Sequence, residues 1–230
     1  MTQNAAPALG IGFYTAGDAA RLLGVPVRNI RRWLGGYNYT QDGEKRHMEP
    51  LWKPQLPRDD DRIELGFRDL IELRFVNAFL DVGLGLKTIR HCLDYARQCV
   101  DDDRPFSTRR FRTDGRTIFL ESANVAGYEN LLDLKNRQYA IKAVIERTFK
   151  DLDIDNDSVS RWRPYKGKSS IVIDPEFVFG QPTTAKYNVP TIALAQAVKA
   201  EGSEKAVAKL FEVPLSVVKD AVAFEASLAA

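Results

Sequence analysis

The chain has 230 residues, of which 44% are hydrophobic and 28% charged, and its formal net charge at neutral pH is +2. This length leaves room for two small domains or for one domain with extensions, and the composition is that of an ordinary soluble protein. The sequence contains no apolar run long enough to cross a bilayer and no signal peptide, so we expect a cytoplasmic protein without membrane contact.

Charge is distributed unevenly along the chain. Between Arg21 and Arg58 there are eight basic and three acidic residues, and between Arg104 and Arg116 there are five basic residues and one acidic residue. Residues 171–230 hold five lysines and seven acidic residues. We therefore expect a polyanion to bind the front of the molecule and a different partner to bind the back.

Two short helices joined by a tight turn are predicted within residues 14–33. Thr15 is a natural N-cap that forms a capping box with Asp18, Gly24 can end the first helix, and Pro26 suits the start of the second. The outer face of the second helix then consists of Arg28, Asn29, Arg31 and Arg32. Such a face is typical of a helix that lies in the DNA major groove. A helical hairpin with a solvated basic face is the alternative.

An extended loop or β-ribbon is predicted for the polar, proline-containing stretch between residues 37 and 61, which would form a wing beside the second helix. An amphipathic helix at residues 66–80 and a further helix at residues 86–100 follow. This order of elements resembles the MerR-type winged helix-turn-helix domain over residues 13–99. We place a DNA-binding domain at residues 13–103, behind a flexible leader at residues 1–12.

The DNA contacts expected of this domain follow from side-chain chemistry. Arg28, Arg31 and Arg32 could reach guanine edges or phosphates, and Asn29 could pair with adenine. Tyr14 and Thr15 would hold phosphate oxygens, while the wing would add charge with little specificity. The wing residues concerned are Lys45, Arg46 and Lys53. A homodimer would read two half-sites spaced by whole helical turns.

A mixed region at residues 104–169 follows the DNA-binding domain. Alternation around Asp114-Gly115 predicts a β-hairpin over residues 106–121, and residues 131–149 could form a helix. A second hairpin is predicted to turn at Asn156-Asp157. The region ends in a basic linker, and we expect the whole fold to be α+β and mainly α.

The C-terminal segment, residues 170–230, has its own signature. The phrases Ile171-Val-Ile-Asp-Pro and Gly180-Gln-Pro precede Val189-Pro190, and three short helices that form a small bundle are predicted after them. This pattern resembles the domain-of-unknown-function family 433 over residues 170–226. Such domains are typically encoded beside small PIN-like nuclease toxins, in proteins that act as antitoxins.

Together, the two resemblances imply a VapB-type antitoxin that neutralises a PIN-like ribonuclease toxin and, as a homodimer, represses its own operon. The acidic, metal-binding cleft of such a nuclease could be plugged by basic side chains. The candidates are Arg109, Arg110 and Arg112 on the first predicted hairpin, and Arg161 and Arg163 in the linker.

Two other classes of function, a ligand-responsive regulator and an enzyme, are alternatives to an antitoxin. A stand-alone MerR-like regulator that responds to a ligand is the alternative, with His91, Cys92 or Cys99 as its sensor; we expect both cysteines to be reduced and to lie on one helix. An enzyme is disfavoured because the chain lacks a nucleophile elbow, a phosphate loop and a dinucleotide fingerprint. We therefore expect no catalytic residues, no cofactor and no metal.

Overall fold

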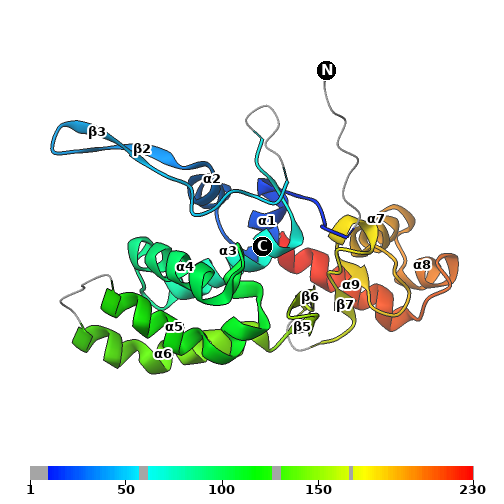
Figure 1. Cartoon of the computed structure of the whole chain (residues 1–230). Coiled ribbons are helices and arrows are strands. Elements are labelled where there is room, and N and C mark those ends of the chain that lie inside the picture. The colour runs from blue at the N-terminus through cyan, green and yellow to red at the C-terminus, as the bar shows by residue number, and fades with distance from the viewer. Residues whose placement is uncertain (1–9, 57–61, 126–130, 166–167, 230) are drawn as a thin grey trace, which may run out of the picture.

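The computed structural model describes residues 10–56, 62–125, 131–165 and 168–229 (Figure 1). The fold is α+β and mainly α, as predicted, with helices joined to small antiparallel two-stranded sheets. The front of the chain contains β1 (Tyr14–Thr15), α1 (Ala16–Leu23), α2 (Val27–Gly35), β2 (Tyr37–Gln41), β3 (Glu44–Met48), β4 (Glu64–Leu65), α3 (Phe67–Asp81) and α4 (Leu86–Val100). The middle contains the 3₁₀ turn η1 (Pro105–Ser107), α5 (Arg109–Val125), α6 (Leu131–Phe149), β5 (Leu152–Asp155) and β6 (Ser158–Trp162). The back contains β7 (Ile171–Val172), the 3₁₀ turn η2 (Val178–Gly180), β8 (Thr183–Thr184), α7 (Thr191–Glu201), α8 (Glu204–Leu210) and α9 (Leu215–Leu228).

The predicted helix pair is confirmed as α1 and α2. Thr15 and Asp18 form the expected capping box, since each accepts the backbone N–H of the other, at 3.1 and 3.0 Å. Gly24 ends α1 in the left-handed region at φ 66°, which a side chain would disfavour. Pro26 then caps α2.

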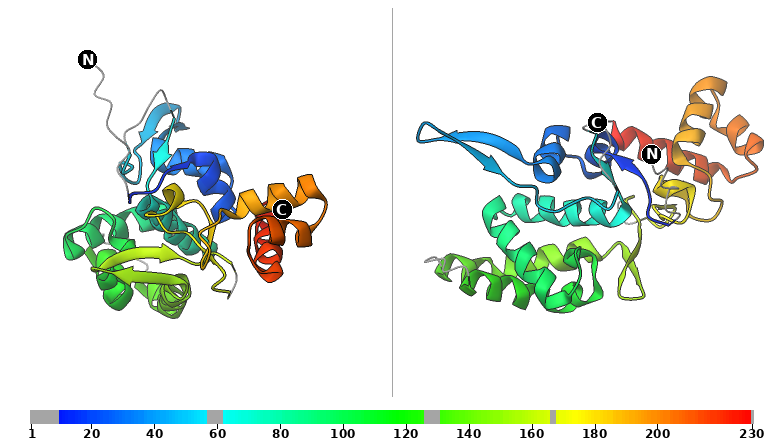
Figure 2. Two further views of the ribbon diagram at one scale, coloured as in Figure 1. Left: turned by 90° about the vertical axis from the view of Figure 1, so that its right-hand side faces the viewer. Right: turned by 45° about the horizontal axis from the view of Figure 1, so that its top comes forward.

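The predicted wing is a β-ribbon of β2 and β3, in which Tyr37 pairs with Met48 and Gln41 with Glu44. Asp42 and Gly43 both have positive φ, the combination that a two-residue hairpin turn requires. The ribbon projects away from the body of the molecule beside α2 (Figures 1 and 2). β1 pairs with β4, so the start of α1 and the start of α3 are held together.

The core is centred on α3, which is buried on most of its surface rather than on one face. Phe75 makes ring contacts with Phe106, Phe111 and Phe149, at centroid distances of 4.9 to 5.9 Å. These contacts join the front of the chain to η1, α5 and α6. The helix predicted at residues 66–80 is therefore confirmed, but it is not amphipathic, because Asp69 and Glu72 are buried together with its apolar residues.

The hairpin predicted at residues 106–121 was also wrong, because this stretch contains the end of η1 and most of α5. Phe111, Ile118 and Phe119 are buried at helical spacing, and they pack against α4 and α6. The Asp-Gly pair that suggested a turn has a different role: a Cβ at Gly115 would lie 3.0 Å from Ile145 Cδ1. Glycine at this position thus allows α5 and α6 to approach closely.

The remaining predicted elements of the middle are confirmed. Residues 131–149 form α6, and β5 and β6 form an antiparallel hairpin that turns at Asn156 and Asp157. Both turn residues have positive φ, which asparagine and aspartate tolerate better than most residues.

The back of the chain forms the predicted three-helix bundle of α7, α8 and α9. Its small core consists of Leu194, Val207, Val213, Val218 and Ala221. Phe224, near the end of α9, belongs instead to the main core.

The bundle is joined to the front of the chain by specific contacts. The Tyr14 hydroxyl donates to the Gly180 carbonyl at 2.7 Å, and Arg21 pairs with Glu225 at 3.1 Å. Residues 1–9 of the predicted leader lie outside the described residues, whereas the Ile11 carbonyl accepts a hydrogen bond from Phe67 N at 2.7 Å.

Candidate nucleic-acid interface

The helix α2 presents basic side chains to solvent. Ile30, Trp33 and Leu34 hold its inner face in the core. On its outer face Arg28 and Arg31 are exposed, and no acidic side chain among the described residues pairs with either. Two guanidinium groups are thus available to a polyanion on a rigid, well-anchored helix.

Arg32 and Asn29 occupy more restricted places. The Arg32 guanidinium lies 3.9 Å from the centre of the Tyr37 ring, at the first position of β2. This cation–π contact orients Arg32 and links α2 to the wing. Asn29 is half-buried on the same helix.

Tyr14 and Thr15 are not placed as we expected for phosphate contacts. The Tyr14 side chain is 2% exposed, its hydroxyl donates to Gly180, and burial raises its pKa well above the ordinary value. The Thr15 hydroxyl donates to Asp18 Oδ2 at 2.6 Å and accepts from the Asp18 N–H. Both hydroxyls are bonded to partners within the chain, so Tyr14 and Thr15 serve to fix β1 and α1.

The wing carries the exposed cations that the sequence placed there. Lys45 and Arg46 are neighbours on β3, so their side chains leave opposite faces of the ribbon. Arg46 contacts Gln41 at 3.3 Å and Glu44 at 3.7 Å, which holds it beside the hairpin turn. Lys53 is exposed beyond the base of the wing.

The segment Glu49–Gln55, which we call the strap, connects the wing to the body and is held by three arginines. Arg90 donates to two strap carbonyls at 2.6 and 2.8 Å, and Arg97 and Arg104 donate to one each, both at 3.0 Å. The strap is also hydrogen-bonded to α2, where Leu51 N donates to the Trp33 carbonyl at 2.7 Å. The arginines of α4 and the following loop therefore fix the base of the wing relative to α2.

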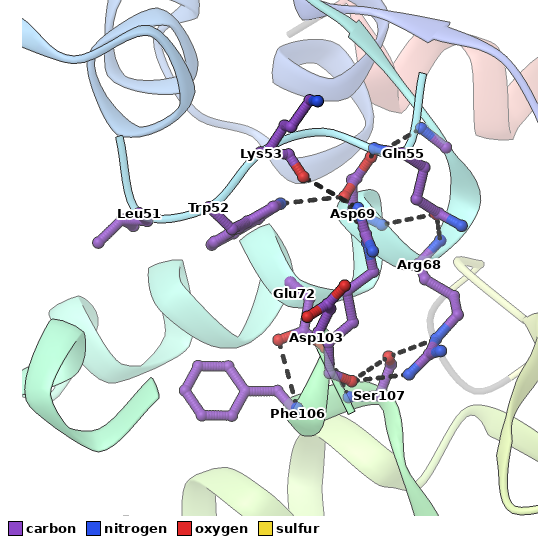
Figure 3. A network of polar contacts seen from close by, with 12 residues as sticks. Leu51, Trp52, Lys53, Gln55, Arg68, Asp69, Glu72, Asp103, Phe106 and Ser107 are labelled. Carbon is purple, nitrogen blue, oxygen red and sulfur yellow. Dashed lines mark hydrogen bonds and ion pairs between the residues drawn. The ribbon is translucent and has the colours of Figure 1, made fainter. Parts of the chain in front are cut away.

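A buried carboxylate completes this support (Figure 3). Asp69 has no exposed surface and accepts four hydrogen bonds, from Trp52 Nε1, Gln55 N, Gly66 N and Arg104 Nε, at 2.7 to 3.0 Å. These donors satisfy the hydrogen-bonding capacity of a carboxylate that has no access to water. Sequence reasoning missed it, although its position three residues after the cap of α3 is a capping signal.

A second buried carboxylate lies one helical turn away. Glu72 accepts the backbone N–H groups of Phe106 and Ser107 at 3.2 and 2.8 Å. Burial raises the pKa of Glu72 to about 7. This residue ties η1, and with it the start of α5, to α3.

Two of the five basic residues proposed for toxin binding are already paired within the chain. Arg161 bonds Asp174 at 2.5 Å, and Arg163 makes two hydrogen bonds of 2.5 Å to Asp153. The Arg163–Asp153 pair links the two sides of the β5–β6 hairpin, and the Arg161–Asp174 pair links the hairpin to the loop after β7. Neither guanidinium is free to enter the cleft of a partner without breaking a pair.

The other three predicted residues lie on α5. Arg109 is 3.1 Å from Asp157 and Arg110 is 3.9 Å from Asp114. Arg112 is exposed and lines a hollow of about 260 Å³ between α5 and α6.

The same hollow is lined by Arg116 and Lys142, two cations that sequence reasoning missed. Arg109, Arg112 and Arg116 are spaced by three and four residues, which is a helical signal. The Asp-Gly pair between them favoured the hairpin prediction instead, so this common face was overlooked.

The residues considered as sensors do not gather at one point. Both cysteines are free and lie on α4, as predicted; Cys92 is buried, which raises its pKa, and Cys99 is half-buried. His91 is exposed on the same helix. In the described part of the chain, no group of three histidine, cysteine or acidic side chains could hold a metal ion, and no helix has the length and apolar character of a membrane span.

Comparison with known proteins gives two similarities over nearly the whole chain. No family model matches the sequence. A crystal structure of Rv2018 from Mycobacterium tuberculosis has the same fold, with a TM-score of 0.72 and 23% identity over 91% of this chain and 96% of that one. The chain is also 23% identical over 223 residues to the Mycobacterium tuberculosis protein named "Putative antitoxin VapB45", an alignment that covers 92% of this chain and 93% of that protein.

Proposed function

We propose that this protein is the antitoxin of a type II toxin–antitoxin system, which neutralises a PIN-like ribonuclease and represses its own operon as a DNA-bound homodimer. The observation that carries the proposal is the similarity to the protein named "Putative antitoxin VapB45", which extends over 92% of this chain and 93% of that protein. An alignment of this extent pairs the DNA-facing front and the bundle at the back with counterparts in one protein.

The DNA-binding part of the proposal is supported by α2 and the wing. No carboxylate among the described residues pairs with Arg28 or Arg31, and their guanidiniums suit base edges or phosphates in a major groove. Lys45, Arg46 and Lys53 would add phosphate contacts. A dimer would place two copies of α2 in successive major grooves.

The toxin-binding part is supported by the basic face of α5. Of the five candidate arginines, Arg112 is exposed without a paired carboxylate among the described residues. Arg116 and Lys142 line the same hollow, where Lys142 lies 3.6 Å from Glu146. A cationic face of this kind complements the acidic cleft of a metal-dependent nuclease. The chain itself acts by binding and performs no catalysis in this scheme.

The toxin is tested by co-expression with the small reading frame beside the gene. We expect the neighbour alone to arrest growth, and the pair to grow and to co-purify. Replacement of Arg112 and Arg116 by glutamate should abolish both the growth of the co-expressing cells and the co-purification. The same replacement of Arg147 and Lys150, which are exposed elsewhere, should abolish neither. A harmless neighbour that does not bind would leave the ligand-responsive regulator as the better proposal.

DNA binding is tested by titration of the upstream operator at fixed salt. Arg31→Ala should weaken binding by about 1–3 kcal/mol, because a guanidinium that contacts a base edge contributes an energy of that size. Lys199→Ala, an exposed cation on α7, is the matched control and should have little effect. Equal affinity of wild type and Arg31→Ala would show that α2 is not the reading helix.

A further inference from the structure

The helices α8 and α9 repeat the architecture of α1 and α2 at one constant offset in residue number. Thr15 caps α1 and Ser203 caps α8, and each side chain accepts the backbone N–H of the third residue that follows. Ala19 of α1 and Val207 of α8, which occupy the same position at this offset, are both fully buried.

The turns between the helices also match. Gly24 and Glu212 occupy the same position and are both left-handed, at φ 66° and 53°. The next residues, Val25 and Val213, are buried, and their N–H groups bond back to the preceding helix at 3.0 Å. A glutamate tolerates this φ poorly, so the turn is imposed by its surroundings and not by local preference.

The second helices begin in the same way. Pro26 and Pro214 cap α2 and α9 with nearly equal φ, −60° and −59°. Four residues later, Ile30 and Val218 are fully buried. The back of the chain therefore contains a second helix-turn-helix, in which α9 takes the place of the reading helix.

The exposed face of α9 differs from that of α2. The positions of the three arginines of α2 hold a hydroxyl, a cation and a carboxylate, which are Ser216, Lys219 and Asp220. The carboxylate is neutralised, because Asp220 pairs with Lys168 at 2.6 Å and this pairing lowers its pKa. The groups for bidentate base reading are thus absent from these positions, whereas the Ser216 hydroxyl and the exposed Lys219 ammonium remain.

A hollow of about 510 Å³ opens beside the first turn of α9. Its lining includes Lys168, Ser169, Lys186, Ser216 and Asp220, and Lys219 lies three residues after Ser216 on α9. Within the described residues, no acidic partner is recorded for Lys186 or Lys219. Ammonium and hydroxyl donors around the start of a reading helix are the groups that bind backbone phosphates in helix-turn-helix complexes.

We propose that the second helix-turn-helix is a further DNA-binding module, which contacts backbone phosphates through Ser216, Lys186 and Lys219 and does not read sequence. It is joined firmly to the first module, since Arg21 of α1 pairs with Glu225 of α9 and Phe224 enters the main core. The site adds to the contacts of α2 and is independent of any toxin.

The test is a titration of the full chain with a random-sequence DNA duplex at several salt concentrations. Replacement of Lys186 and Lys219 by alanine should weaken binding about tenfold and lower the slope of log affinity against log salt by about two, one for each lost phosphate contact. The control replaces Lys199 on α7 and Lys205 on α8, two exposed lysines of the same bundle away from α9, and should leave the slope unchanged.

Three results would overturn the proposal: no change in either double variant, an equal change in both, or loss of a co-purified toxin without loss of DNA binding. The last result would make the hollow a protein site. Arg31→Ala separates this proposal from operator reading by α2. If Arg31→Ala binds the operator normally and the Lys186 and Lys219 variant weakens binding to the random duplex, reading by α2 fails and the second module stands.

Discussion

Arg104 donates a hydrogen bond of 2.7 Å from Nε to Oδ1 of Asp69, whose carboxylate has no exposed surface. Replacement of Asp69 by alanine should destabilise the protein by about 3–5 kcal/mol, because it leaves a largely buried guanidinium without its counter-ion. The Trp52 indole N–H would also lose its acceptor. Denaturant unfolding measures the change.

Asp94 provides the matched control. Its ion pair with Arg97 has a similar length, 2.8 Å, but the Asp94 side chain is 54% exposed. Asp94→Ala should therefore cost less than about 1 kcal/mol. Equal costs for the two aspartate variants would mean that burial of Asp69 does not stabilise the strap.

The arginines that hold the strap should affect DNA affinity without contacting DNA. Alanine at Arg90 and Arg97 frees the carbonyls of the strap, so the wing should lose its fixed position and operator affinity should fall about tenfold, with the salt slope unchanged. A residue that contacts phosphate would lower that slope. Lys87→Ala, an exposed cation of α4, controls for charge and should do nothing. A reduced slope for the double variant would make these arginines DNA contacts.

The sequence predicted those elements whose signals are local. The capping box of Thr15 and Asp18, the left-handed Gly24 and the Asn156-Asp157 turn each act through neighbouring residues, and all three were confirmed. Gly115 was misread, because its small size serves contact with Ile145 on α6, which is distant in sequence.

The candidate interface residues divide in the same way, into those placed by local signals and those placed by partners distant in sequence. Exposure of Arg28 and Arg31 follows from the helical period of α2 and was predicted. That Arg161 is paired with Asp174 could not be predicted, because the partner lies on a different element. The buried roles of Asp69 and Glu72 were also missed, since a carboxylate in a helix is ordinarily assigned to solvent.

The stability of the protein should decrease as pH rises through the titration of Glu72. Its pKa is raised by burial to about 7 from an ordinary value of 4.5, so the folded state keeps the proton where the unfolded state has lost it. The stabilisation is thus complete below pH 4.5 and is lost as pH rises to 7.

Unfolding free energies measured across this pH range, for wild type and Glu72→Gln, test the effect. Glutamine cannot ionise, so the difference between the two proteins should change with pH between the two values. A constant difference would show that Glu72 is ionised in the folded protein throughout.

The joint between the front of the chain and the bundle depends on close contact of Tyr14 with Gly180. Gly180 has φ 78°, and a Cβ there would lie against the Tyr14 hydroxyl oxygen. Gly180→Ala should therefore destabilise the protein by several kcal/mol, of which about 1–3 kcal/mol is backbone strain. Tyr14→Phe should cost about 1 kcal/mol through its lost hydrogen bond.

Because the phenylalanine lacks the clashing oxygen, the double variant should be more stable than the sum of the single changes predicts. Chemical unfolding of all four proteins measures this coupling, and strict additivity would mean that the hydroxyl and the glycine do not constrain each other.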